Sequence, residues 1–577
     1  MVVATVAMAG SPGRGAPAAQ GPIKTHVHSL SLTGAGASLK TLGARSTAPF
    51  SMVGVTWNGA HAELRGTVEV RTRSAADGHW TQWLKMQQPD DLPDAAELNR
   101  PGVRGGMSPL WAGPSNGIQV RATGAGRTTT LPAGLRVDLV DPGKPATDGT
   151  PDSGMGLAGY AIDATATDTA APPVTDTASP TDSSTPTDTA TPTTGTGASD
   201  PATATDSPSP TDTSTATNPT STTPSTTPST GTSASSSPSG SPTAWPGQLP
   251  TTAEAYPSCT ASSTAPSATP PDPMPAATVS TVAPPAVVTR AGWGADECAR
   301  DSGYPSYGSA VKVMFVHHTD TTNDYSCADS PAIVRGIYAE HLNQGWRDLG
   351  YNFLVDKCGT VFEGRFGGMA LPVVGAQTYG FNTNSMGVAA IGTYTDLSGG
   401  DSTASTFTGA APSQAMLASI ARIADWKFGM TGVNPGTGTA SLPEGSSDSH
   451  GFTLGNSYTF DAISGHRNGF ATDCPGNQLY NALSTIRSYA AGPVGAVSIT
   501  GMSGGAAKSG TNYYTKGAAT VSWTTATPSA VISGFDVLVD GKAVAHTSGS
   551  ARSASVTVAS GSHTVQVRAT HVRGATT

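Results

Sequence analysis

The sequence predicts a multidomain protein whose centre is an α/β domain, a mixed sheet flanked by helices, with a β-rich domain on each side. Strand-length apolar runs alternate with amphipathic helical patterns between residues 286 and 491. Short alternating strands without a helical period occupy 26–142 and 494–577. A Thr/Ser/Pro-rich stretch at 143–285 separates the first β-region from the centre.

The N-terminal region combines a short leader with a β-domain. Residues 1–25 are expected to be flexible or the remainder of a secretory signal segment. Many short strands with Gly/Pro turns at 26–142 predict a β-sandwich. Trp57, Trp80 and Trp83 would line a sugar-binding face or, as is more common, anchor the packing.

The stretch 143–285 contains too few large apolar residues to offset chain entropy by burial. We therefore expect a disordered linker, open to O-glycosylation, that gives the central domain reach from the first domain. A spacer without any binding role is the simpler alternative.

The central region, 286–491, contains sequence patterns typical of strands and patterns typical of helices. A near-continuous apolar run at 385–392 is typical of a central strand covered on both faces. Helices are expected from Ser330 as N-cap, over 413–428, and over 478–489.

The C-terminal region, 494–577, alternates apolar and polar residues in several runs, with Asp540–Gly541 as a hairpin turn. This pattern favours an immunoglobulin-like or fibronectin-like β-domain. No final strand is evident before Thr577, which leaves a truncated last domain open.

Charge bounds the class of partner. Only 12% of residues are charged and the net charge is -9, whereas a nucleic-acid binder needs clustered Lys and Arg. No apolar run is long enough to span a bilayer. We therefore expect no nucleic-acid partner and no transmembrane segment.

The five cysteines divide unevenly between two expected uses. If Cys474 is a metal thiolate, four remain, and four can form two disulfides in an oxidising compartment. We favour Cys327–Cys358 and Cys259–Cys298, with buried thiols as the alternative.

Three side chains are candidates for a zinc site. The apolar run 311–316 ends directly in His317, which places an imidazole at a strand terminus. His466 and Cys474 follow far downstream, the latter before a Pro-Gly turn. Zinc favours N and S ligands, and a catalytic site keeps its fourth position for water. Spacing alone also fits buried packing residues.

The region from about Val288 to Ala490 resembles the type 2 N-acetylmuramoyl-L-alanine amidases and peptidoglycan recognition proteins. The segments that carry the resemblance are Arg290-Ala-Gly-Trp-Gly-Ala, Phe315-Val-His-His-Thr, Gly345-Trp-Arg-Asp-Leu-Gly-Tyr-Asn-Phe-Leu-Val, Gly359-Thr-Val-Phe-Glu-Gly-Arg, Gly375-Ala-Gln, Asn384-Ser-Met-Gly-Val, Gly465-His-Arg and Thr472-Asp-Cys-Pro-Gly. They cover roughly a third of the chain, and the whole resembles secreted actinobacterial cell-wall amidases.

The resemblance implies a role for each matching residue. His317, His466 and Cys474 match the zinc ligands, and Cys474 matches the cysteine that many family members lack when they only bind peptidoglycan. Tyr351 matches a tyrosine near the metal, where its hydroxyl orients water or the scissile carbonyl. Thr472 offers a hydroxyl to a developing oxyanion.

Substrate contacts are less well specified. The strand at 388–390 lacks a glutamate that some bacterial members carry, so it supplies no carboxylate base. Gln377 replaces a histidine common after Gly-Ala. His318, Arg365 and Gln377 are the candidate substrate contacts, although His318 also fits a packing role and Arg365 a structural turn.

The resemblance implies a secreted, zinc-dependent hydrolase of the cell wall. Its substrate is the amide between N-acetylmuramic acid and L-alanine of peptidoglycan, and we expect a monomer. Two alternatives belong to other classes: a peptidoglycan-binding protein without catalysis, and a surface adhesin whose β-domains are the functional part. The peptide type of the stem is not specified.

Overall fold

The computed structural model describes residues 21–34, 36–89, 91–126, 129–144, 275, 278–301, 305–396, 409–446 and 451–577. These residues fall within one compact unit of the chain. The expectations for the leader before residue 21, for most of the 143–285 stretch and for Cys259 lie outside the described residues, so the Cys259–Cys298 pairing stays a prediction. No helix in the described part is long and apolar enough to cross a bilayer.

The N-terminal domain is a seven-stranded antiparallel sheet, with β5 paired to the end of β2. Its core contains inward side chains from β2, β3, β6 and β7, among them Val53, Val68 and Ile118. Trp57 belongs to this core, whereas Trp80 and Trp83 are half-buried beneath the Arg71 guanidinium. Its elements are β1 His26–Ser31, β2 Leu39–Asn58, β3 Gly66–Ser74, β4 Leu84–Lys85, α1 Ala95–Leu98, β5 Arg104–Gly106, β6 Leu110–Gly124 and β7 Arg136–Asp141.

Hydrogen bonds join all the strands of this domain into one sheet, whereas a β-sandwich in its usual form has two. The reason is the length of β2, at 20 residues, and of β6, at 15 residues. Register shifts interrupt the β2–β6 pairing, and β2 changes partner from β6 to β7 along its length. Such irregularities bend a sheet, so that one sheet can surround its own core.

The central domain contains a mixed five-stranded sheet in the order β10-β9-β11-β8-β14. Strands β9, β11, β8 and β14 run parallel, and β10 is antiparallel to β9. Every residue of β8 and β11 is buried, as expected for strands covered on both faces. The elements are α2 Arg290–Trp293, β8 Val313–His318, α3 Ser330–Asn343, β9 Phe353–Val355, β10 Val361–Glu363, β11 Ser385–Ala390, α4 Gln414–Gly429, β12 Thr439–Pro443, β13 Ser457–Asp461, β14 Ile463–Gly465, α5 Asn477–Asn481 and α6 Leu483–Ala491.

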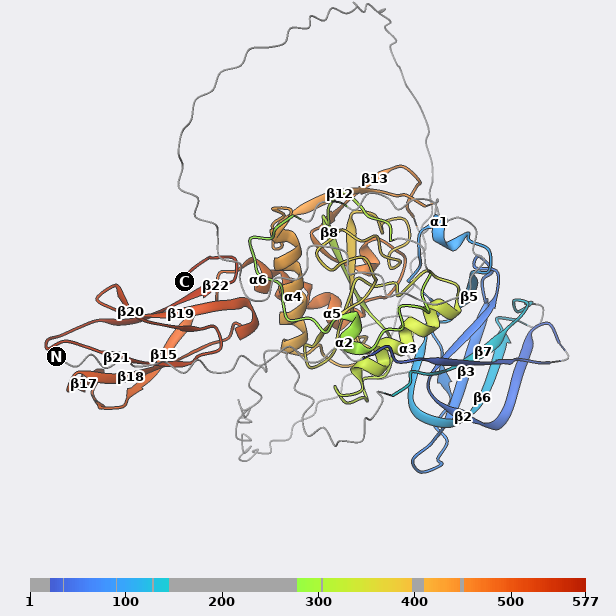
Figure 1. The fold of residues 1–577 in the computed structure, drawn as a ribbon, viewed down its shortest axis with the longest axis horizontal. Coiled ribbons are helices and arrows are strands. Elements are labelled where there is room, and N and C mark those ends of the chain that lie inside the picture. Colours follow the sequence, from blue (N-terminus) through green and yellow to red (C-terminus); the bar gives the residue numbers. More distant parts are fainter. Residues whose placement is uncertain are drawn as a thin grey trace, which may run out of the picture. The chain divides into compact units, whose positions relative to one another are not determined.

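Helices cover both faces of this sheet. Figure 1 shows α3 and α4 on either side of strand β8. Ile420 and Ile423 of α4 share a core with Val316 and Val388, while Ile333 and Ile337 of α3 share another with Ala389. The sheet is thus buried between two helical layers, and the carboxyl ends of its parallel strands are where a site is expected.

Three local boundaries differ from expectation. Asp329, not Ser330, precedes α3, and the Ser330 hydroxyl donates instead to Asp356 at 2.8 Å. The last helix is broken at Ala482 into α5 and α6. Packed structure also begins before residue 286, because Val282 is only 3% exposed. The helix over 413–428 is confirmed, with the Ser413 hydroxyl accepting from the backbone N–H of Met416.

The C-terminal region contains two three-stranded sheets, β15-β18-β21 and β20-β19-β22, and a separate β16-β17 hairpin. Side chains from both sheets, including Val521 and Val537, share one core, an arrangement that fits the expected sandwich. The strands are β15 Val497–Ser503, β16 Ala506–Ser509, β17 Asn512–Thr515, β18 Ala518–Thr525, β19 Ile532–Val539, β20 Lys542–Ser548, β21 Ser553–Thr557 and β22 Val565–His571.

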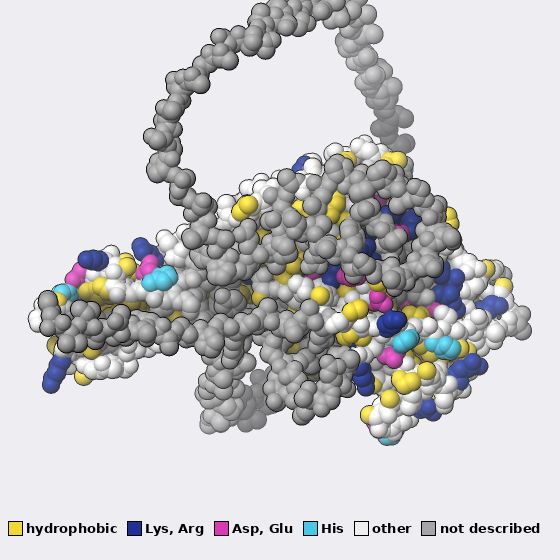
Figure 2. All heavy atoms as spheres, in the orientation of Figure 1, with side chains coloured by type: hydrophobic (Ala, Val, Ile, Leu, Met, Phe, Trp, Pro, Cys, Tyr) yellow, Lys and Arg dark blue, Asp and Glu magenta, His cyan; other side chains and the backbone are white. Residues whose placement is uncertain are grey.

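The face drawn in Figure 2 carries charges of both signs among uncharged residues. Lys and Arg side chains of the described residues are scattered over this face, so its field is that of a mixed surface.

Candidate metal centre

Two neighbouring parallel strands bring the histidines together. His317 is the penultimate residue of β8, and His466 follows the last residue of β14. The register pairs Val316 with Gly465, so the next residue on each strand is a histidine. The two imidazole centroids lie 4.3 Å apart and both side chains are fully buried. The carboxyl ends of adjacent parallel strands therefore build this half of the site.

The loop after His466 positions the sulfur of Cys474 beside the histidines. The backbone N–H of Arg467 donates to the Cys474 carbonyl at 3.0 Å, which closes the loop. The N–H of Cys474 donates to the Thr472 hydroxyl at 2.9 Å. The sulfur lies 3.4 Å from the backbone N–H of His318, from which it accepts, and 3.9 Å from the His318 carbonyl. Among the described cysteines, Cys474 is the one outside a disulfide.

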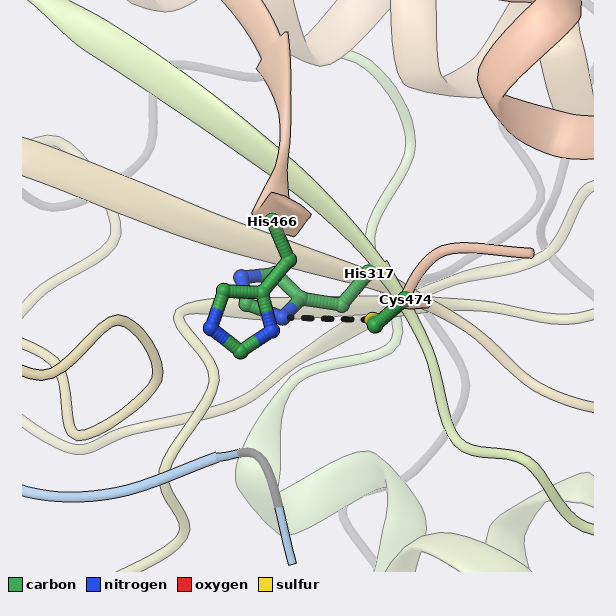
Figure 3. A group of neighbouring side chains, drawn as sticks. All are labelled: His317, His466 and Cys474. Atoms are coloured by element: carbon green, nitrogen blue, oxygen red, sulfur yellow. Dashed lines mark hydrogen bonds between the residues drawn. The ribbon is translucent and has the colours of Figure 1, made fainter. Parts of the chain in front are cut away.

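The three side chains are spaced as metal ligands. Cys474 Sγ lies 3.8 Å from His317 Nδ1, and one ligand atom from each of the three residues lies within 4.8 Å of the others. Figure 3 shows the two rings side by side with the sulfur facing the His317 ring. Two imidazoles and a thiolate form a donor set of the kind zinc binds. The residues present therefore fit a zinc ion.

Gln377 orients the ring of His317. Its Oε1 lies 2.7 Å from His317 Nε2 and also accepts from the Thr378 hydroxyl at 2.5 Å. Its Nε2 donates to Ser385 Oγ at 3.1 Å, which sets the orientation of the amide. In the tautomer that fits this contact, Nε2 carries the proton and the Nδ1 lone pair is available to a metal. Gln377 is fully buried, so it supports a ligand where we expected a substrate contact.

Tyr351 lies beside the histidines, as its motif implied. Its ring centroid is 5.5 Å from that of His317, and its side chain is 2% exposed. The hydroxyl donates a short hydrogen bond to Asp91 Oδ2. Beneath it, His341 accepts from the Gly350 N–H at 3.1 Å and stacks on Trp346. Burial lowers the pKa of His341 to about 4, which keeps this imidazole neutral.

The remaining candidates take different places. His318 Nδ1 accepts from the backbone N–H of Tyr394 at 3.4 Å, and burial lowers the pKa of His318. This arrangement matches the packing role that we considered for it. Arg365 is buried and forms an ion pair with Glu97 of the N-terminal domain. The Thr472 oxygen accepts from the Cys474 backbone, a contact that shapes the ligand loop.

Asp91 is the residue that sequence reasoning missed. It lies between β4 and α1, and its Oδ1 is 3.2 Å from His317 Nδ1 and 3.8 Å from His466 Nδ1. The blue ribbon below the three side chains in Figure 3 belongs to this N-terminal region. No motif in the first domain pointed to Asp91, because only folding brings it to residues more than 200 positions away.

Comparisons with known proteins match two parts of the chain. Residues 307–477 match the family described as N-acetylmuramoyl-L-alanine amidase, and residues 11–151 match an N-terminal galactose-binding domain-like family. The mouse N-acetylmuramoyl-L-alanine amidase is 30% identical over 208 residues, which are 35% of this chain and 31% of the mouse protein. Human peptidoglycan recognition protein 3 is 31% identical over 113 residues, 19% of this chain and 31% of that protein.

Among solved structures, Drosophila PGRP-LB covers 35% of this chain and 93% of its own, with 20% identity and a TM-score of 0.25. The chain spans about a third of the length of the mouse and human amidases that it matches. The match at 307–477 coincides with β8, α3, β11, β14 and all three candidate ligands. The central domain of this protein therefore matches the family described as N-acetylmuramoyl-L-alanine amidase over residues 307–477 and is similar to peptidoglycan recognition proteins; we call it the amidase domain.

Proposed function

We propose that the protein is a secreted, zinc-dependent peptidoglycan hydrolase that cleaves the amide between N-acetylmuramic acid and L-alanine. The observation that carries the proposal is the convergence of His317, His466 and Cys474, with their ligand atoms within 4.8 Å of one another. A protein that only binds the polymer has no need of a buried thiolate beside two imidazoles.

Each residue has a defined part in this hydrolysis. A zinc ion held by the two imidazoles and the thiolate supplies a Lewis acid and lowers the pKa of water. Gln377 Oε1 contacts His317 Nε2, which orients the ring with Nδ1 toward the metal position. The Tyr351 hydroxyl, 2% exposed as a side chain, orients the scissile carbonyl by hydrogen bonding. Water adds to the carbonyl carbon, the C–N bond breaks, and the amine of L-alanine leaves with a proton.

Secretion to the cell wall is supported by the Cys327–Cys358 disulfide, a bond that persists in oxidising compartments. Peptidoglycan is the proposed partner, since relatives of this domain carry peptidoglycan recognition in their names. We propose that the protein acts as a monomer.

The test uses the purified full-length protein with defined muropeptides. Zinc should bind at one ion per chain, and mass spectrometry should find free stem peptide that disappears with chelator and returns with added zinc. Binding of muropeptide without any release of stem peptide, in protein that holds zinc and in the Asp91 variants described below, would favour a binding protein. Turnover that persists without metal would exclude the proposed mechanism.

A further inference from the structure

The segment 91–98 of the N-terminal domain lies against the candidate metal centre, and we name it the capping segment. Its first residue, Asp91, approaches both imidazoles through Oδ1 and accepts from the Tyr351 hydroxyl through Oδ2. Asp91 Oδ1 is buried, yet no hydrogen bond to it is found among the described residues. A buried carboxylate oxygen without a hydrogen bond is costly unless a cation faces it.

The distances from Asp91 Oδ1 to the two imidazoles are compatible with those between ligands of one metal ion. With metal–ligand bonds of about 2.0 to 2.3 Å, tetrahedral ligand atoms lie about 3.3 to 3.6 Å apart. Asp91 Oδ1 is 3.2 and 3.8 Å from the two histidine nitrogens, while the sulfur is 3.8 Å from one of them. Asp91 Oδ1 thus lies at ligand-like distances from the two imidazoles, although it stands outside the group of three residues whose ligand atoms lie within 4.8 Å of one another.

Further along, the capping segment is bound by polar contacts with the amidase domain. Asp94 Oδ1 accepts from the Gly380 N–H at 2.9 Å and from Asn382 Nδ2 at 2.8 Å. Glu97 Oε1 accepts from the Arg347 N–H at 2.8 Å, and its other oxygen pairs with Arg365. Two carboxylates besides Asp91 are thus held by the amidase domain.

Apolar contacts also join the capping segment to the amidase domain. The capping segment contributes Leu92, Ala95 and Leu98 to a cluster with side chains of the amidase domain. The side chains from the amidase domain are Trp346, Ala376, Tyr379 and Phe470. Phe470 stacks on His466, with ring centroids 5.4 Å apart, so this apolar cluster is continuous with the metal centre.

We propose that the capping segment is a built-in inhibitor of the amidase domain, with Asp91 as a fourth metal ligand. Asp91 takes the position where water and the substrate carbonyl would enter, and it engages the Tyr351 hydroxyl. Glu97 pairs with Arg365, the arginine expected to contact the stem peptide. The Glu97 carboxylate therefore competes with the stem peptide for this arginine. The inference rests on the proposed function, because it requires a metal and a substrate at this site.

The test compares Asp91→Asn with Asp77→Asn in the full-length protein. Asp77 lies in an exposed turn of the same domain, where it pairs with His79, so the control carries the same chemical change away from the site. Zinc affinity is measured by competition with a chromophoric chelator, muropeptide affinity by calorimetry, and turnover by stem-peptide release.

The two affinities should move in opposite directions in Asp91→Asn. Zinc affinity should fall by about tenfold, because a charged ligand is lost. Muropeptide affinity and kcat/KM should rise by about tenfold if about nine-tenths of the molecules are capped. Asp77→Asn should resemble the unaltered protein, and Glu97→Gln should raise muropeptide affinity without changing zinc affinity.

Two outcomes overturn the inference while leaving the proposed function intact. If turnover falls and zinc affinity stays constant in Asp91→Asn, Asp91 acts as a general base. If neither affinity changes, the capping segment is only an interdomain contact. A protein that binds no zinc in any variant would instead refute the proposed function, so the two failures are distinguishable.

Discussion

Both β-rich domains contact the amidase domain, but they meet different parts of it. The N-terminal domain contacts His317 of the metal centre through Asp91 and pairs with Arg365 through Glu97. The C-terminal domain meets helices α4 and α6, where His571 Nε2 lies 2.7 Å from the Tyr489 carbonyl and Arg573 lies 3.7 Å from Asp425. The N-terminal domain thus contacts the candidate metal centre, and the C-terminal domain contacts helices that support the sheet.

The difference shows that a contact between domains is not itself a functional statement. Both contacts combine polar and apolar groups, with Val531 as the apolar contribution of the C-terminal domain, and both domains are built from strands. What separates them is a single acidic segment between β4 and β5 that is long enough to reach the open strand ends. Regulation or catalysis should therefore respond to changes on the N-terminal side and not to changes on the C-terminal side.

The largest effect is expected from Cys474→Ala, which defines what loss of the centre itself looks like. Zinc binding should fall below detection and turnover should fall by on the order of 10³ or more, because the Lewis acid is worth several kcal/mol. Metal analysis and stem-peptide release measure both.

The matched control uses the other cysteine pair. Changing Cys327 and Cys358 to Ser together removes a disulfide that closes a separation of 31 residues. Stability should drop by about 3 to 4 kcal/mol in the chain-entropy account, while zinc still binds to the folded protein. Equal loss of zinc in folded samples of both proteins would contradict the assignment of Cys474 as the ligand.

A smaller effect is expected from Gln377→Met, which removes the acceptor that orients His317. Partners of this kind typically change metal affinity by about 10- to 100-fold, and we expect a decrease in that range. Gln414→Met is the control, since Gln414 lies on α4 and contacts the C-terminal domain through the Ala526 carbonyl at 3.3 Å. Unchanged zinc affinity in Gln377→Met would show that the tautomer needs no such support.

A pH effect is expected from His341, whose pKa of about 4 lies below its usual value because of burial. Between pH 6.5 and 4 the unfolded chain binds a proton that the folded protein does not, so stability falls as pH decreases through this window. The shift corresponds to about 3 kcal/mol. His341→Asn should be less stable at pH 7 but lack this acid-dependent loss, which denaturant unfolding at several pH values would reveal. Parallel pH curves for both proteins would argue against the assignment.

The smallest effect on the site is expected from the C-terminal side. Changing His571 and Arg573 to Gln together removes contacts with α4 and α6. Zinc affinity and turnover should stay within about twofold, because these contacts reach none of the ligands among the described residues. A tenfold change in either quantity would erase the distinction between the two β-domains.

Local patterns predicted much of the central domain. The apolar face predicted over 413–428 correctly located α4, because helical periodicity is a local property of the sequence. The apolar runs of β8 and β11 predicted strands of the central sheet. The histidine at the end of β8 predicted a candidate metal ligand. The break at Ala482 and the single bent sheet of the N-terminal domain were not predictable, because they depend on packing and on strand partners distant in sequence.

The sequence by itself determined which side chains are able to bind a metal, because residue types and the ordered motifs do not depend on coordinates. Only the tertiary structure decided what surrounds them: Gln377 turned inward to His317, and Asp91 arrived from another domain. The physical reason is that residue identity is a local property, whereas the neighbours of each candidate ligand are set by which distant surfaces pack together.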